Sequence, residues 1–188
     1  MISAVDIKVY GGYYEIVSGM DFGVSSETAE FVTYEHGGVW YVRGDECRRK
    51  ASQTLIVLPY DMKIRRFSIS VYDGAFKVEP FSADKVIINA NNSSGEVSLD
   101  SVGELRLDVG RGTLRANIKK SDKTCVECGR GKVDLTLGKT DGGYSIISKH
   151  GIGSVSLNSI ALPRDFNKQG GPCKVDIVCG MGCVNLYT

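Results

Sequence analysis

The sequence lacks the features that mark several common classes of protein. Lysine and arginine number 23 and aspartate and glutamate 22, so the net charge of +1 is far from the basic excess of nucleic-acid-binding proteins. The one compact basic run, residues 48–50, follows Asp45 and Glu46 and indicates a solvated turn. No apolar run approaches the roughly 18 residues that a membrane-spanning helix needs. We therefore expect neither a nucleic-acid partner nor membrane insertion.

Motifs for catalysis or nucleotide binding are also missing. The two histidines, His36 and His150, accompany no nucleophile motif, and no spacing selects a pair of carboxylates for acid–base chemistry. The Gly-x-Gly phrases lack the third glycine and the following helix of a dinucleotide fingerprint. The sequence therefore predicts no catalytic residue and no cofactor, and it favours a protein that is not an enzyme.

What the sequence does contain is a short strand-like phrase that begins with Gly-x-Gly. The residues before the glycines correspond between copies as well: Leu105, Leu107 and Val109 match Val175, Ile177 and Cys179. A unit that recurs about every 20 residues is typical of a stacked β architecture. The four copies of the phrase are Gly110–Ala116, Gly129–Leu135, Gly151–Leu157 and Gly180–Leu186.

We therefore predict an all-β fold, a single right-handed β-solenoid (β-helix) in one domain that spans residues 1–188. Residues 55–188 would form the repeated coils, and residues 1–54 an irregular N-terminal cap of strands and hairpins, with hairpin turns at Gly11–Gly12 and Gly37–Gly38. The glycines of the repeat would let the chain bend at coil corners, where a Cβ is costly.

Alternation of apolar and polar residues predicts which side chains face the core. In a strand, every second side chain points to the same face, so the apolar positions of the repeat should form continuous buried columns. These positions are Leu107, Val126, Ile146, Val175 and Ile177 before the corner, and Leu114, Val133, Val155 and Val184 after it.

In this serial arrangement the chain resembles the bacterial putative-adhesin domain family. The resemblance rests on the run Leu55–Pro59, the successive Gly-x-Gly copies, the phrase Gly142–Ile147 and the closing phrase Cys179–Gly182. It covers residues 55–188 well and the first 54 loosely. It implies a toast-rack-like β-solenoid, largely of unknown function and often linked to cell-envelope proteins, with no catalytic residues to carry over.

Cysteine and histidine placement leaves a metal site as one alternative. Cys128, His150 and Cys179 each precede the first glycine of a copy and would stand in one column of a stack, and Cys125 adds a Cys-x-x-Cys spacing. The favoured interpretation is that this column faces inward, as Val109 indicates, and that its cysteines are small buried apolar residues. We therefore expect no stoichiometric metal.

The outward positions around the corners are the remaining candidates for function. Two neighbouring copies place four basic residues near one edge, with Asp108 and Asp134 available to balance them, so an anionic partner competes with a solvated, self-compensated face. The four candidates for a binding surface are Arg111, Arg115, Arg130 and Lys132.

Taken together, these patterns favour a non-enzymatic structural or binding module that presents a rigid β surface to a protein or glycan. The alternatives are a β-helix enzyme that acts on a polysaccharide, which would need a groove with converging charged groups, and an envelope-stress sensing or scaffold domain.

As written, without a visible secretory signal, the chain is expected to be cytoplasmic; if it is a fragment of a longer protein, the alternative location is the cell envelope. The segment from Ala161 to Pro172 is expected to cap the C-terminal coil through Leu162 and Phe166, which keeps the protein monomeric or weakly dimeric.

Overall fold

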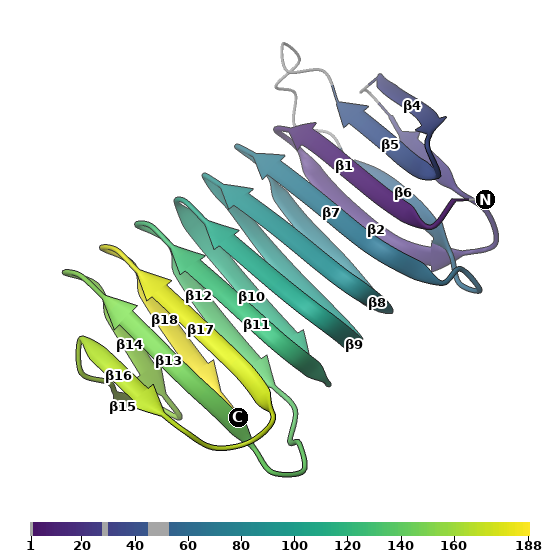
Figure 1. Cartoon of the computed structure of the whole chain (residues 1–188). Coiled ribbons are helices and arrows are strands. Elements are labelled where there is room, and N and C mark those ends of the chain that lie inside the picture. Colours follow the sequence, from purple (N-terminus) through teal and green to yellow (C-terminus); the bar gives the residue numbers. More distant parts are fainter. Residues whose placement is uncertain (1, 28–29, 45–52) are drawn as a thin grey trace.

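The computed structural model describes residues 2–27, 30–44 and 53–188, and within these ranges the protein is all-β, without a helix (Figure 1). The basic run 48–50 lies outside the described residues. The strands of the described residues form one connected 18-stranded sheet with both parallel and antiparallel pairs. β-Branched and aromatic residues between glycine-containing turns explain why strands dominate.

In the first part of the chain the strands are β1 (Ala4–Tyr10), β2 (Tyr13–Gly19), β3 (Gly23–Ser26), β4 (Phe31–His36), β5 (Val39–Gly44), β6 (Gln53–Pro59), β7 (Ile64–Tyr72), β8 (Ala75–Asn91) and β9 (Ser93–Val109). They continue with β10 (Gly112–Ile118), β11 (Ser121–Cys128), β12 (Lys132–Leu137), β13 (Tyr144–His150), β14 (Ser154–Leu157), β15 (Ile160–Ala161), β16 (Asp165–Lys168), β17 (Cys173–Cys179) and β18 (Cys183–Tyr187).

The strands lie in two facing layers (Figure 1). The first layer contains, side by side and parallel, β5, β1, β7, the later parts of β8 and β9, β11, β17 and β13. The second layer contains β6, β2, the early parts of β8 and β9, β10, β12, β18 and β14. β8 and β9 cross from the second layer to the first. We call a strand of the first layer and the strand of the second layer that follows it in the chain a unit.

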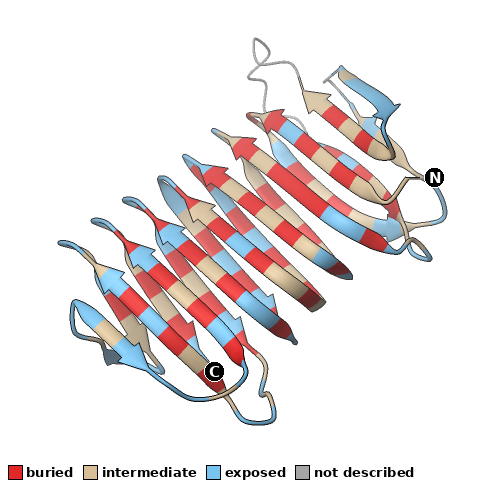
Figure 2. Ribbon diagram, viewed as in Figure 1, coloured by how far each residue is buried: buried red, intermediate tan, exposed pale blue. Residues whose placement is uncertain are grey.

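The core lies between the layers, and the predicted buried columns are confirmed. All nine predicted positions expose 1% or less of their side chains. Figure 2 shows that buried and exposed residues alternate along most strands, in register from one strand to the next, and this alternation builds the columns. Val133, for example, pairs with Leu114 on one side and Val184 on the other, so each column is continuous across units.

The corners need glycine because neighbouring units approach closely. Gly112 has a φ of 107°, and a Cβ at this position would collide with the carbonyl oxygen of Ser93 in the preceding unit. The predicted hairpin at Gly37–Gly38 is confirmed, since it joins the antiparallel strands β4 and β5. The hairpin predicted at Gly11–Gly12 is wrong. These residues form a corner between β1 and β2, which lie in opposite layers and pair with other strands.

At both ends the order of units in space differs from their order in the chain. The β1–β2 unit lies between the β5–β6 and β7–β8 units, although we predicted from the sequence that residues 4–19 belong to the N-terminal cap. At the opposite end the β17–β18 unit lies between the β11–β12 and β13–β14 units (Figure 1). The first and the last unit of the chain therefore each lie second from an end of the stack.

The segment 161–172 consequently covers a different unit from the one that we expected. The last strand, β18, is not an open end, because it pairs with both β12 and β14. The cap covers the β13–β14 unit instead: β16 pairs antiparallel with β13, and β15 with β14. Leu162 and Phe166 are half-buried and pack against the core, as expected of the cap contacts. β3 and β4 cover the other end in the same antiparallel manner.

Candidate functional site

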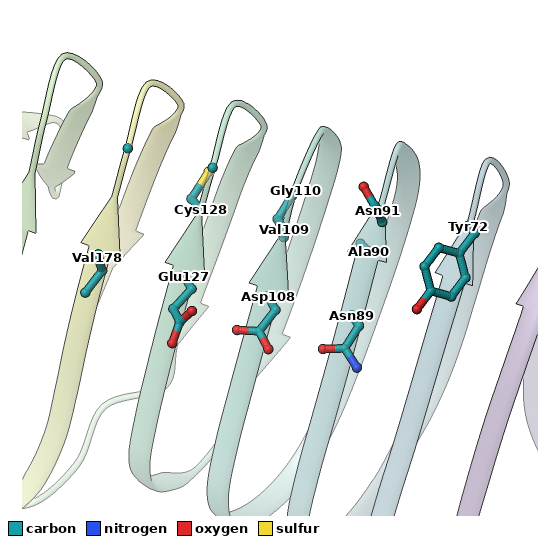
Figure 3. A pocket seen from close by; sticks show the side chains of 12 residues that line it. Tyr72, Asn89, Ala90, Asn91, Asp108, Val109, Gly110, Glu127, Cys128 and Val178 are labelled. Atoms are coloured by element: carbon teal, nitrogen blue, oxygen red, sulfur yellow. The ribbon is translucent and has the colours of Figure 1, made fainter.

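A shallow groove of about 520 Å³ crosses the first layer close to the glycine corners. Four neighbouring strands of this layer, β8, β9, β11 and β17, contribute its wall, and Tyr72 at the end of β7 closes one end. Figure 3 shows the side chains in this arrangement. The residues that give the groove its chemistry are Tyr72, Asn89, Asn91, Asp108, Glu127 and Val178.

The floor of the groove is bare backbone because three glycines stand side by side. Gly110, Gly129 and Gly180 are each the first glycine of a corner, and each is exposed. A Cβ on Gly129 would lie 3.0 Å from the carbonyl oxygen of Gly110, and one on Gly180 would lie 3.1 Å from that of Gly129. The close spacing of units thus selects glycine, and the missing side chains leave a trough above the backbone.

One wall of the groove is a row of four side chains that the parallel register aligns. Asn89 pairs with Asp108, Asp108 with Glu127, and Glu127 with Val178. The Arg106 guanidinium holds both carboxylates: its Nε lies 2.9 Å from Oδ2 of Asp108, and a terminal nitrogen lies 3.0 Å from Oε1 of Glu127. The hydrogen bond to Asp108, followed by the charges of Asp108 and Glu127, raises the pKa of Arg106. Two carboxylates therefore share one cation.

Tyr72, which forms one end of the groove, belongs to an aromatic pair. The rings of Tyr72 and Tyr10 stack with centroids 5.0 Å apart and an angle of 19° between their planes. The ammonium group of Lys8 lies 5.5 Å from the Tyr10 centroid and 5.8 Å from the Tyr72 centroid. Tyr72 lines the groove and Tyr10 does not. These contacts restrict the orientation of the Tyr72 ring.

The structure divides the four basic residues that the sequence places on one surface. Arg111 and Arg130 follow Gly110 and Gly129 directly, so they stand exposed at the corner that borders the groove. Arg115 and Lys132 lie on the outer face of the second layer.

Arg115 and Lys132 are compensated by neighbouring carboxylates. Arg115 Nη1 lies 3.7 Å from Oε1 of Glu96, and Lys132 Nζ lies 2.9 Å from Oδ2 of Asp134. Asp134 thus balances a predicted basic residue as expected, whereas Asp108, the other expected partner, pairs with Arg106. A binding surface that combines all four cations remains a prediction, and only the corner pair lies beside the groove.

The column of metal candidates is real but is ordered differently from the sequence. Cys128 pairs with Cys179, and Cys179 with His150, so Cys179 occupies the central position. Burial, followed by the neighbouring Cys179, raises the pKa of the Cys128 thiol to about 11, which disfavours the thiolate that a metal needs. The Cys128 thiol donates to the carbonyl oxygen of Gly131 at 3.2 Å, and His150 Nε2 lies 3.2 Å from that of Leu162.

Among the described residues, no three His, Cys, Asp or Glu side chains form a group that could hold a metal ion. The absence of stoichiometric metal stays a prediction, which elemental analysis of the purified protein would check.

Sequence reasoning missed most residues of the groove wall. Asp108 and Glu127 stand two residues before the first glycine of a copy, as Val178 does, and Asn89 holds the same register position on β8. A comparison of this outward position between copies would have revealed two acids and an amide in one row. Tyr72 carries no such signal, because it precedes the clear copies of the repeat.

Comparison with solved structures shows which proteins share the fold. A putative cell adhesion protein from Clostridium sporogenes ATCC 15579 matches with a TM-score of 0.55 over 99% of this chain and 93% of that chain, at 16% sequence identity. A putative adhesin from Bacteroides fragilis NCTC 9343 matches with a TM-score of 0.49 over 98% and 93%, at 11% identity.

The fold is thus one found in putative adhesins, and the resemblance seen in the sequence is confirmed at the level of fold. No protein-family model matches the sequence, and no curated protein does. The described part of the chain also contains no apolar helix of bilayer-spanning length.

Proposed function

We propose that the chain is a right-handed β-solenoid that acts as a non-enzymatic binding module of the adhesin type and holds its ligand in the groove of the first layer. The observation that carries this proposal is the trough itself. Hydrogen-bonded backbone forms its floor, aligned polar side chains form its wall, and an aromatic ring closes one end. Concave sites with a few fixed polar groups are the usual form of ligand sites.

The same geometry favours binding over hydrolysis of a polysaccharide. A glycosidase places two carboxyl groups on opposite sides of the bond that it cleaves, and one of them must carry a proton. Asp108 and Glu127 instead stand side by side on neighbouring strands of one wall, and both are paired with the same guanidinium. The groove is also shallow and therefore open to water.

The proposal is tested by filling the groove. Asn91 is exposed beside Gly110, so Asn91→Trp would lay an indole over the trough without disturbing the core. The matched control is Thr136→Trp, at a position that is also exposed but lies on the outer face of the second layer. Wild type and both variants are applied to immobilised glycans and immobilised non-glycosylated proteins.

We expect the control to retain the binding of wild type and Asn91→Trp to lose at least about tenfold, or 1.4 kcal/mol of binding free energy. Equal binding by Asn91→Trp would move the site elsewhere on the surface. Cleavage of any immobilised glycan would establish the enzyme instead.

A further inference from the structure

The wall of the groove offers hydrogen-bond acceptors rather than donors. Asn89 donates its amide nitrogen to the Ser70 hydroxyl at 2.9 Å, which leaves its carbonyl oxygen for a ligand. Figure 3 shows this oxygen on the side of Asp108, whose carboxylate faces it from the next strand. Glu127 adds a second carboxylate, whose exposed fraction is 57%. A ligand on this wall must therefore bring hydrogen-bond donors.

The aromatic end of the groove adds a flat apolar surface next to these acceptors. Tyr10 stacks on one face of the Tyr72 ring, and Tyr72 itself lines the groove. Aromatic rings with a polar rim suit ligands that are themselves apolar on one face and polar at the edge. A pyranose has this character, because its axial C–H bonds form an apolar face and its hydroxyl groups ring the edge.

Charge around the groove argues against an ionic ligand. Arg106 already occupies the two carboxylates, so a metal ion or an amine would have to displace it. Arg111 and Arg130 at the adjacent corner would repel a cation as well. An anion would meet the carboxylates of the wall. A ligand whose hydroxyl groups donate without carrying charge avoids both penalties.

Backbone pairing argues against an extended peptide. Peptides that bind sheets commonly add a strand to a free edge, where the backbone groups have no partner. The strands below this groove lie in the middle of the layer: β9 pairs with β8 and β11, and β11 pairs with β9 and β17. Their backbone groups are used within the sheet, so recognition has to come from side chains.

From these observations we propose that the groove binds the end of a neutral saccharide chain. The terminal pyranose stacks on the face of Tyr72 opposite Tyr10, and its hydroxyl groups donate to Asn89 and Asp108. The next sugar lies over Gly129 and reaches Glu127, because strands about 4.8 Å apart present one side chain each along the trough. This inference rests on the proposed function, since it names the ligand class of the same groove.

The experiment titrates the protein with neutral oligosaccharides of glucose, galactose and mannose, and separately with an oligogalacturonate and an oligolysine, and follows the amide resonances by NMR. The variants are Tyr72→Ala, Tyr72→Phe and the matched control Tyr187→Ala, which removes an exposed tyrosine from the second layer. A thermal melt of each variant shows whether the fold is intact, and Tyr72→Phe keeps the ring if Tyr72→Ala is unstable.

We expect at least one neutral oligosaccharide to shift resonances of residues 89–91, 108–110 and 127–129. We expect Tyr72→Ala to weaken its binding about tenfold or more, Tyr72→Phe to change it less than about threefold, and Tyr187→Ala to leave it unchanged.

The outcomes separate this inference from the proposed function. If oligolysine or oligogalacturonate binds in the groove and neutral saccharides do not, the saccharide inference is wrong while a binding groove stands. If neutral saccharides bind elsewhere and are unaffected by Tyr72→Ala, the inference and the groove both fail. If none of the neutral saccharides shifts a resonance at the highest soluble concentration, the inference is rejected.

Discussion

The two layers share one core, yet one row of side chains on each outer face differs from the other in how its charges pair. Across the second layer, one row of side chains alternates in sign from strand to strand and pairs internally. Lys77 Nζ lies 2.9 Å from Oε1 of Glu15, and Asn185 donates to Asp134 at 2.7 Å. The full row, in register, is Glu15, Lys77, Glu96, Arg115, Asp134, Asn185 and Ser156.

In the first layer, the row that forms the groove wall does not alternate in sign in this way. Between Asn89 and Val178, the carboxylates of Asp108 and Glu127 pair with a single cation, Arg106, beside the three glycines of the floor. The comparison teaches that one core can carry a row whose charges alternate and pair along the sheet and a row in which two carboxylates share one cation. The predictions that follow test this division, from the largest expected effect to the smallest.

Replacement of Val133 by Asp should unfold the domain and so remove both outer faces together. Val133 has no exposed surface and stands in the middle of a core column that both layers share. An unpaired carboxylate there costs several kcal/mol, a large part of the about 5–15 kcal/mol that stabilises a typical domain. Thermal unfolding followed by circular dichroism checks this. An unchanged midpoint would contradict the shared core.

Replacement of residues 161–172 by a short Gly-Ser linker should expose one end of both layers. The variant loses β16 and part of β15, so β13 and β14 become free edges with core side chains beside them. Free edges pair with other strands, so we expect association at this end of the stack. Light scattering measures it, and a variant as small and monodisperse as the parent would show that the cap does not control assembly.

Charge reversal should cost more stability on the second layer than on the first. Asp134 accepts from Asn185 and pairs with Lys132, whereas Glu127 has one ionic partner and a 57% exposed side chain. We expect Asp134→Lys to lose about 1 kcal/mol and Glu127→Lys to lose less. Urea unfolding of the two variants compares them directly. A larger loss of stability for Glu127→Lys would contradict the stronger internal pairing of the second-layer row.

The pH dependence of Asp134 gives the finest test of the second layer. Burial acts to raise the pKa of Asp134, but the hydrogen bonds from Asn185 and Lys132 outweigh it, so the pKa is lowered in the folded protein. A lowered carboxyl pKa stabilises the fold above the unfolded value, about pH 4, and this contribution is lost as the pH falls through the folded value. Lowering the pH below about 4 should therefore reduce the stability of wild type more than that of Asp134→Asn, as measured by urea unfolding. Equal losses would mean that the row adds no acid sensitivity.

The sequence by itself determined the class of fold and the inward positions. The alternation around Leu107, Val133 and Val184 has only one register that buries all three residues, since a slip by one position turns every side chain to the other face. The glycines at 110, 129 and 180 likewise announce corners, because only a residue without a Cβ tolerates the close approach of the next unit.

Only the tertiary structure decided which units are neighbours and therefore which side chains meet. Repeated units have nearly interchangeable edges, so the local pattern cannot say that β17 enters between β11 and β13, or β1 between β5 and β7. That order puts Val178 at the end of the Glu127 row and Cys179 between Cys128 and His150. The candidate site is a property of contacts between units, whereas the sequence pattern specifies each unit alone.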